Sequence, residues 1–363
     1  MIKRVVLTGG PGSGKTTVIE SIKKNFGGKY KVIVVDETAS YLINMGIRPF
    51  GDDKISMIDF QELVLKTQLS KEDILNTSLK YLNDENILII YDRGLLDNCA
   101  YISKEEFEEV LSRLDKKYTI NEFLERYDLV INLVSRQDFY TTENNSARSE
   151  KVEEALELGN KTLFSWLGHN NLKIVYPKDD LNEKIREVLN YINNILKEHE
   201  VKSQEKYLID ISKTDIKKIK SISKLAHINQ TYLESDDSVE KRIRETTMDG
   251  NTTYTYTIYK TLKSGQKVKV SEESITKRIY DKLIDFKDKK KETISKDRYY
   301  FPYEDEYFTL DIYDNYGILE INVTDDKKTK LPSFIDVVEE VTNKEEYQNI
   351  NLANKISKQF TKK

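Results

Sequence analysis

The sequence lacks the features that mark secreted, membrane-spanning and nucleic-acid-binding proteins. Its 363 residues include one cysteine, Cys99, so no disulfide can form within the chain and a reducing compartment fits. No apolar run approaches the roughly 18 residues of a membrane span. The N-terminus leads directly into a strand pattern, so we expect no signal peptide. The formal net charge is only −4, which does not favour nucleic acid as a partner. We therefore expect a cytoplasmic protein.

The length of the chain fits two domains, because one domain takes about 100–200 residues. Up to residue 198, apolar strand patterns alternate with helical patterns, which predicts a parallel α/β sheet with helices on its faces. From residue 201 onward, aromatic and threonine-rich alternation is typical of antiparallel strands. We predict an α/β domain over residues 1–198 and a β-rich domain over residues 201–363.

A phosphate-binding pattern, G-x-x-x-x-G-K-T, occupies residues 9–16 between a predicted strand and a predicted helix. Glycines let backbone N–H groups turn toward phosphate oxygens, and the helix N-terminus adds partial positive charge. An ordinary glycine-rich turn would explain the glycines but not the lysine and threonine. We predict binding of ATP or GTP with Mg²⁺, with Lys15 on the β- and γ-phosphates and Thr16 on the metal. The predicted nucleotide contacts are Gly10, Gly12, Ser13, Gly14, Lys15, Thr16 and Thr17.

Two acids follow predicted strands at the sheet edge where ligands bind in α/β folds. Asp92 closes the apolar run 86–91 and is predicted to support Mg²⁺ together with Thr16. Glu37 follows the strand at 31–35. It either acts as a general base toward water or a substrate hydroxyl, or it caps the helix that follows.

Three further side chains each allow two interpretations. Arg136 and Arg148 flank a polar loop after the fourth predicted strand, where a lid would close over phosphates. Arginine is also common on surfaces, so a solvated position explains both equally well. Gln61, on a helical pattern over 57–75, is either a base-recognition residue or a solvated helix residue.

These motifs together resemble a small P-loop ATPase/kinase family related to nicotinamide-riboside kinases and deoxynucleoside kinases. The resemblance rests on residues 9–16, Asp36-Glu37-Thr38-Ala39, Phe60-Gln61, Asp92-Arg93-Gly94 and the segment 145–150. It implies phosphoryl transfer, with Lys15, Glu37, Asp92, Arg136 and Arg148 as the catalytic set. Water as the acceptor would make the domain an NTPase, and a hydroxyl acceptor would make it a kinase.

In the second half, several predicted strands place basic residues on one face and apolar residues on the other. The pattern fits an antiparallel sheet with one solvated face, or a barrel whose basic interior holds a polyanion. Arginines two residues apart favour the barrel, because inward-facing guanidinium groups suit phosphate oxygens. The predicted anion contacts are Lys206, Arg242, Arg244, Lys260, Lys267, Lys269, Lys296 and Arg298.

Residues 201 to 355 resemble a CYTH domain, the fold of triphosphate tunnel metalloenzymes. The matching motifs are Gln230-x-Tyr232-Leu233, Lys241-Arg242-Ile243-Arg244, Thr257-x-x-Lys260, Ile275-Thr276-x-x-x-Tyr280, Ile294-x-Lys296-x-Arg298, Asp311-Ile312-Tyr313, Gly317-Ile318-Leu319-Glu320 and Glu340-Val341-Thr342. The resemblance implies an antiparallel barrel that binds triphosphate or polyphosphate. The order of the two domains resembles the TRPL translocation defect protein family, which implies binding of GTP and phosphoinositides.

The chain departs from the CYTH pattern at its metal-binding acids. The opening Glu-x-Glu-x-Lys motif reads Lys202-Ser203-Gln204-Glu205-Lys206 here, so only its lysine remains. Asp311 and Glu320 remain as candidate metal ligands, although a hard cation needs several oxygens. We therefore expect the barrel to bind a phosphorylated ligand and to hydrolyse it poorly.

Two other functions fit the same motifs. In the first, the protein is a nucleotide-gated switch with little turnover, in which nucleotide controls binding of the second phosphate ligand. In the second, it is a triphosphatase whose chemistry lies in the barrel. No transmembrane segment is predicted, so contact with a membrane would be peripheral.

Overall fold

The computed structural model describes residues 1–82, 86–135, 146–197, 203–236, 238–262, 267–314, 316–323 and 329–354. The chain divides into two compact units, Met1–Val201 and Lys202–Lys363. Among the described residues, no helix has the length and apolar character needed to cross a lipid bilayer.

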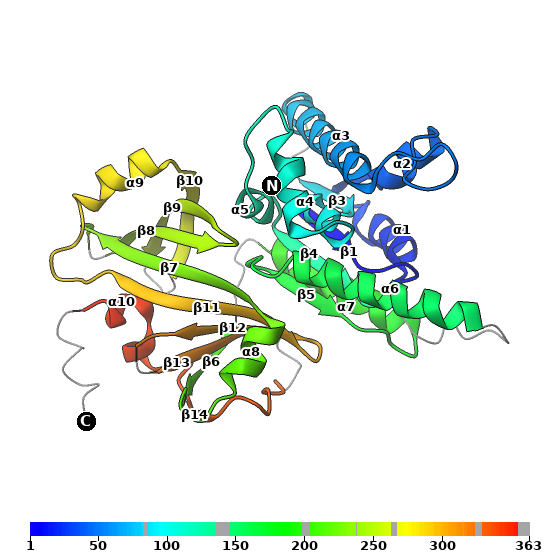
Figure 1. Cartoon of the computed structure of the whole chain (residues 1–363). Coiled ribbons are helices and arrows are strands. Elements are labelled where there is room, and N and C mark those ends of the chain that lie inside the picture. The colour runs from blue at the N-terminus through cyan, green and yellow to red at the C-terminus, as the bar shows by residue number, and fades with distance from the viewer. Residues whose placement is uncertain are drawn as a thin grey trace. The chain divides into compact units, whose positions relative to one another are not determined.

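The first unit is built on a five-stranded parallel sheet with the strand order β2-β3-β1-β4-β5 (Figure 1). Its strands are β1 (Ile2–Thr8), β2 (Lys31–Val35), β3 (Ile87–Asp92), β4 (Leu129–Leu133) and β5 (Leu172–Val175). Its helices are α1 (Lys15–Phe26), α2 (Thr38–Asn44), α3 (Met57–Ser78), α4 (Lys104–Ser112), α5 (Ile120–Leu124), α6 (Ser146–Ser165) and α7 (Leu181–Leu196), with short 3₁₀ turns η1 (Leu79–Tyr81) and η2 (Leu95–Ala100). The predicted parallel α/β sheet is confirmed.

The central strands are apolar along their whole length because helices cover both faces of the sheet. On one face, Val5 and Leu7 pack in the core that α1 and α7 complete. On the other face, Tyr91 packs edge-to-face against Tyr127, which in turn contacts Trp166 just after α6. The sheet is thereby fixed on both sides, and its strand ends present a rigid edge for ligands.

The second unit is a nine-stranded antiparallel sheet with the order β10-β9-β8-β7-β11-β12-β13-β6-β14 (Figure 1). The strands are β6 (Ser203–Ile209), β7 (Lys224–Leu233), β8 (Val239–Met248), β9 (Asn251–Thr261), β10 (Lys267–Ile275), β11 (Ile294–Tyr303), β12 (Glu306–Ile312), β13 (Gly317–Val323) and β14 (Val337–Glu340). The remaining elements are α8 (Ile216–Ile222), α9 (Lys277–Ile284), η4 (Glu345–Tyr347) and α10 (Asn349–Leu352). The predicted antiparallel β-rich architecture is confirmed.

One face of this second sheet is apolar and is covered by helices. Ile219 of α8 packs with Phe301, Phe308 and Leu310 in one buried cluster. Tyr280 of α9 packs with Ile243 in a second cluster. Side chains alternate along strands, so the residues between these apolar ones lie on the opposite face. That opposite face carries most of the charged residues that the sequence singled out.

Candidate functional site

The glycine-rich loop joins β1 to α1 and requires backbone angles that favour glycine. Gly9 and Gly14 have φ angles of 132° and 84°, which L side chains rarely adopt. A Cβ atom on Gly9 would lie 2.1 Å from the carbonyl oxygen of Leu133, so glycine also permits close contact with β4. Lys15 Nζ lies 3.2 Å from the Gly9 oxygen and 3.3 Å from Ser13 Oγ. The loop therefore holds an ammonium group over its own backbone.

A charged cluster lies beside this loop and consists of Lys15, Glu37, Asp92, Arg93 and Asp97. Arg93 is its centre, because its Nε lies 2.6 Å from Glu37 Oε1 and its Nη1 donates to the Gly9 oxygen at 3.1 Å. Asp97 lies 3.6 Å from the same guanidinium group. The cluster thus connects the ends of β2 and β3 to the phosphate-binding loop.

Glu37 precedes α2, but its side chain does not cap that helix. Its carboxylate instead contacts Arg93 and accepts a hydrogen bond from Ser40 Oγ at 2.6 Å. Burial opposes ionisation of Glu37, but the Ser40 hydrogen bond and Arg93 outweigh it and lower the pKa of the carboxyl group. Glu37 is therefore a carboxylate at neutral pH, and Arg93 and Ser40 fix the positions of its two oxygens.

For Asp92 and Lys15, unlike Glu37, burial sets the direction of the pKa shift. Burial raises the pKa of Asp92, with Lys15 acting against the shift, and lowers the pKa of Lys15 to about 8, with Arg93 adding to the shift. Asp92 Oδ1 is buried and has no hydrogen-bond partner among the described residues. A buried carboxylate oxygen without a partner fits a Mg²⁺ ligand, and the exposed Thr16 opens the first turn of α1.

The sequence did not single out Asp97 as a site residue, and Arg93 entered only as part of a motif. Asp97 is 2% exposed, and its Oδ1 accepts hydrogen bonds from Thr8 Oγ1 at 2.7 Å and from Trp166 Nε1 at 2.6 Å. The spacing of four residues between Arg93 and Asp97 on one turn-forming segment was the available signal. Asp97 therefore helps to hold the guanidinium group of Arg93 in position.

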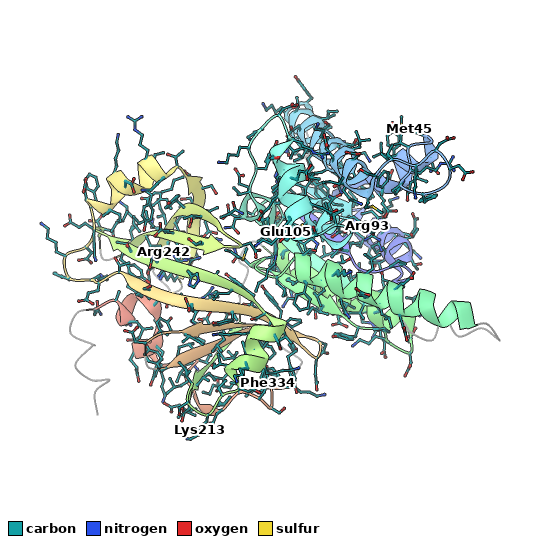
Figure 2. All side chains as sticks on the ribbon, in the orientation of Figure 1. Met45, Arg93, Glu105, Lys213, Arg242 and Phe334 are labelled. Atoms are coloured by element: carbon teal, nitrogen blue, oxygen red, sulfur yellow. The ribbon has the colours of Figure 1, made fainter. Side chains whose placement is uncertain are left out.

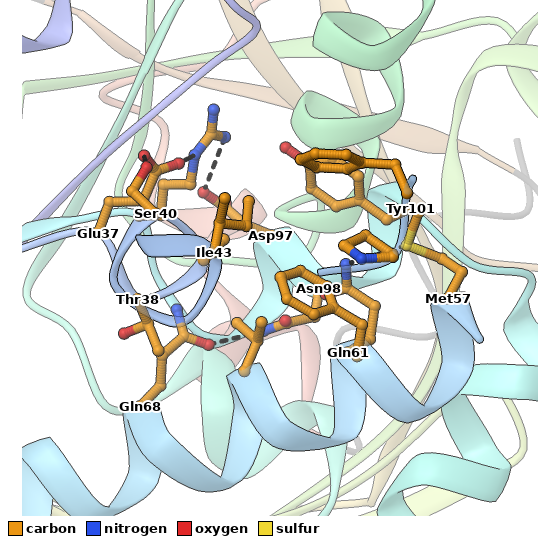
Figure 3. Close-up of a pocket in the computed structure, with 16 residues that line it drawn as sticks. Glu37, Thr38, Ser40, Ile43, Met57, Gln61, Gln68, Asp97, Asn98 and Tyr101 are labelled. Atoms are coloured by element: carbon orange, nitrogen blue, oxygen red, sulfur yellow. Dashed lines mark hydrogen bonds and ion pairs between the residues drawn. The ribbon is translucent and has the colours of Figure 1, made fainter. Parts of the chain in front are cut away.

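A pocket of about 300 Å³ opens beside Glu37 and Arg93 (Figure 3). Side chains from α2, α3 and η2 converge on it. Its apolar lining includes Ile43, Phe50, Met57, Phe60 and Val64, and its polar lining includes Glu37, Gln61, Gln68, Arg93, Asp97, Asn98 and Tyr101. The structure therefore brings Gln61 and Glu37, 24 positions apart in the chain, to one cavity.

The two arginines predicted for a lid are not placed by the structure. Arg136 lies outside the described residues, and Arg148 belongs to α6 but its side chain lies outside the described part. Both roles stay predictions.

In the second unit, strand register puts charged residues on one face. Directly paired residues in antiparallel strands share a face, and the pairs include Lys206 with Glu320 and Arg298 with Asp311. The residues that share this face and interact there form a polar cluster, which consists of Lys206, Glu240, Arg242, Arg244, Lys267, Lys269, Glu272, Lys296, Arg298, Asp311 and Glu320. Arg242 of this cluster is labelled in Figure 2. The side chains of Lys296 and Asp311 are each 1% exposed, so this part of the face is not a solvated surface.

The structure does not bring Lys260 to the polar cluster. Lys260 pairs with Val239 on β8, and both lie on the opposite face from Arg242 and Tyr259. Its side chain is exposed there. The reason is its spacing: it lies three residues after Thr257, and an odd spacing reverses the face in a strand.

The parallel sheet, the glycine-rich loop and the acids at its edge define a P-loop nucleotide-binding domain. Residues 4–184 match the family model described as AAA domain, and the first unit is accordingly an AAA-type P-loop domain. No curated protein matches the chain.

Three solved structures are similar to parts of the chain. Thymidylate kinase from Ehrlichia chaffeensis is 14% identical over 53% of this chain and 98% of its own, with a TM-score of 0.35. The inorganic triphosphatase NE1496 is 21% identical over 41% of this chain and 95% of its own, with a TM-score of 0.31. The PH1819 protein from Pyrococcus horikoshii is 17% identical over 34% of this chain and 80% of its own, with a TM-score of 0.26.

Proposed function

We propose that the first unit is a Mg²⁺-dependent kinase that transfers the γ-phosphoryl group of ATP or GTP to a hydroxyl group of a small molecule. One observation carries this proposal. Arg93 contacts both the phosphate-binding loop, at Gly9, and Glu37 at the mouth of the pocket. A molecule in that pocket would present its hydroxyl group beside the bound triphosphate, which is the arrangement that in-line transfer needs.

Each of these side chains has its own role in phosphoryl transfer. The loop N–H groups and Lys15 hold the β- and γ-phosphates. Thr16 and Asp92 would hold a Mg²⁺ ion, which would supply charge neutralisation for the phosphate oxygens. Glu37 accepts the proton of the acceptor hydroxyl as the new oxygen–phosphorus bond forms and the bond to the leaving diphosphate breaks. Arg93 stabilises the charge that develops on the transferred group. Arg136 and Arg148 are further candidates for that role.

The pocket lining indicates the acceptor. Phe60 and Val64 offer apolar walls, while the buried amide of Gln61 offers a donor and an acceptor. We therefore propose an acceptor with a flat, uncharged ring that has a polar edge, such as a nucleoside, and a hydroxyl group that reaches Glu37.

Turnover of the full-length chain tests this function. ATP or GTP with Mg²⁺ is supplied with a panel of nucleosides and other hydroxyl compounds, and phosphorylated products are detected by mass spectrometry. Glu37→Gln should lower kcat by about 100-fold or more, because general-base catalysis contributes that much, and leave the nucleotide Kd unchanged. Glu20→Gln, an exposed glutamate on α1, is the matched control. Full activity of Glu37→Gln would contradict the proposed base.

For the second unit we propose binding of a polyanion by the polar cluster: a triphosphate, a polyphosphate or a phosphoinositide-type headgroup. The cluster contains seven bases and four acids, which leaves an excess of positive charge. The test is a thermal-shift series with tripolyphosphate, inositol phosphates and phosphoinositide vesicles, in a Lys15→Ala background that weakens the nucleotide site. Ligands that bind the native state raise its apparent stability.

Matched variants locate the binding site. Arg242→Ala with Arg244→Ala should abolish the stabilisation, whereas Lys260→Ala, on the opposite face, should preserve it. Stabilisation that survives the double variant would place the anion elsewhere.

A further inference from the structure

The acids of the polar cluster are already occupied by bases. Asp311 accepts hydrogen bonds from Lys296 Nζ at 2.5 Å and from Arg298 Nε and Nη2 at 2.5 and 2.6 Å, so both of its oxygens are engaged. Glu320 accepts from Lys206 Nζ at 2.7 Å and lies 3.6 Å from Arg298. The two acids that the sequence offered as metal ligands are thus ion-paired within the protein.

The other two acids of the cluster also pair with bases. Glu240 is paired with Lys267 through Oε2, whereas its Oε1 lies 4.0 Å from Arg242 Nη1 and has no hydrogen-bond partner among the described residues. Glu272 is paired with Lys269 at 3.1 Å and accepts a hydrogen bond from Thr257. Among the described residues, no group of three or more histidine, cysteine, aspartate or glutamate side chains could hold a metal ion.

This face would bind a divalent cation weakly. Mg²⁺, Ca²⁺ and Mn²⁺ need several oxygen ligands, and here a cation would compete with the lysine and arginine side chains that pair with the carboxylates. The displaced ammonium and guanidinium groups would remain beside the metal, since Lys296 is buried with Asp311.

Two bases of the cluster have no acid in hydrogen-bond contact among the described residues. Arg244 donates to the neutral Oε1 of Gln230 at 3.0 Å, and Arg242 donates to the hydroxyl of Tyr259 at 2.9 Å. Within the described part of the chain, the Nε atoms of both arginines are buried and have no hydrogen-bond partner. Burial lowers the pKa of Arg244 to about 10, and the neighbouring Arg242 and Arg298 add to the shift.

We infer that the polar cluster binds its phosphate ligand directly through Arg242 and Arg244, without a divalent cation, because lysine and arginine side chains already pair with the carboxylates that a cation would use. Guanidinium groups bind phosphate oxygens through paired hydrogen bonds and do not need a bridging metal. This inference rests on the proposed function of the second unit as a polyanion-binding module.

The experiment is calorimetric titration of the full-length Lys15→Ala chain with tripolyphosphate, once in EDTA and once with Mn²⁺. We expect the Kd in EDTA to equal or be lower than the Kd with Mn²⁺, since the metal only competes for the phosphate. Binding that is tenfold or more tighter with Mn²⁺ would overturn the inference but leave the proposed function intact. No binding in either buffer would refute the proposed function itself.

Variants assign the binding to the cluster. In EDTA, Arg242→Ala with Arg244→Ala should weaken tripolyphosphate binding by 100-fold or more, and Lys260→Ala should change it less than twofold. An unchanged Kd in the double variant would overturn the inference, because the anion would then bind elsewhere. Arg242→Lys with Arg244→Lys keeps the charge and removes the paired donors, so it should weaken binding by about tenfold and remain folded.

Discussion

Raising the pH should weaken nucleotide binding, because Lys15 loses its proton in the free protein. Burial and Arg93 lower the pKa of Lys15 to about 8. Bound phosphates stabilise the ammonium form and raise that pKa again. Binding therefore requires the protonated lysine, so the affinity is full well below pH 8 and falls as the pH rises through 8.

The magnitude follows from the titration of one group. With a pKa of about 8, Lys15 is protonated in roughly three quarters of free molecules at pH 7.5 and in roughly one tenth at pH 9. The affinity should thus fall roughly eightfold across this interval, about 1.2 kcal/mol, and binding at pH 9 should take up about 0.9 proton. The nucleotide phosphates are already ionised over this pH interval, so they add little to the proton uptake.

Calorimetric titration in two buffers of different ionisation enthalpy measures both the Kd and the proton uptake. Lys15→Arg should remove the dependence, because arginine stays charged. Lys184 needs its own control, since burial and Lys15 also lower its pKa to about 8 and it donates to the Ser13 oxygen under the loop. Lys184→Gln should retain most of the slope. A wild-type Kd that does not change with pH, without proton uptake, would exclude Lys15 as a group that titrates on nucleotide binding.

Three further changes have defined outcomes. Asp92→Asn should lower Mg²⁺-dependent turnover on the order of 100-fold in steady-state kinetics, because the metal site loses its charged ligand; normal turnover would exclude Asp92 from the site. Gly94→Ala should cost about 1–3 kcal/mol in urea unfolding, because its Cβ would lie 2.6 Å from the Trp166 ring. Lys296→Met should destabilise the second unit by about 3 kcal/mol, because it leaves Asp311 with Arg298 alone, and adding Asp311→Asn should restore part of the loss.

Local sequence patterns predicted the parts of the protein that depend on short-range order. The glycine spacing in residues 9–16 specifies the loop that the structure shows between β1 and α1. Alternation along strands also predicted that Arg242 and Arg244 share a face, since a strand reverses its side chains at every residue.

Partners distant in the chain could not be predicted in this way. Arg93 contacts Gly9, and Asp97 contacts Trp166, only because β1, β3 and α6 assemble around one sheet edge. The pairing of Asp311 with Lys296 and Arg298 depends on the register between β11 and β12, which the turn between the strands sets and composition does not reveal.

The fate of the γ-phosphoryl group decides whether the first unit is a kinase. The full-length chain is incubated with Mg²⁺ and with ATP or GTP carrying ¹⁸O in the γ-phosphoryl group, together with the acceptors that pass the panel above. We expect the label to appear in an organic phosphate monoester, and we expect Lys15→Ala and Glu37→Gln each to suppress this product. Label that appears solely in inorganic phosphate, at the same rate with and without acceptor, would contradict a kinase and would make the first unit an NTPase.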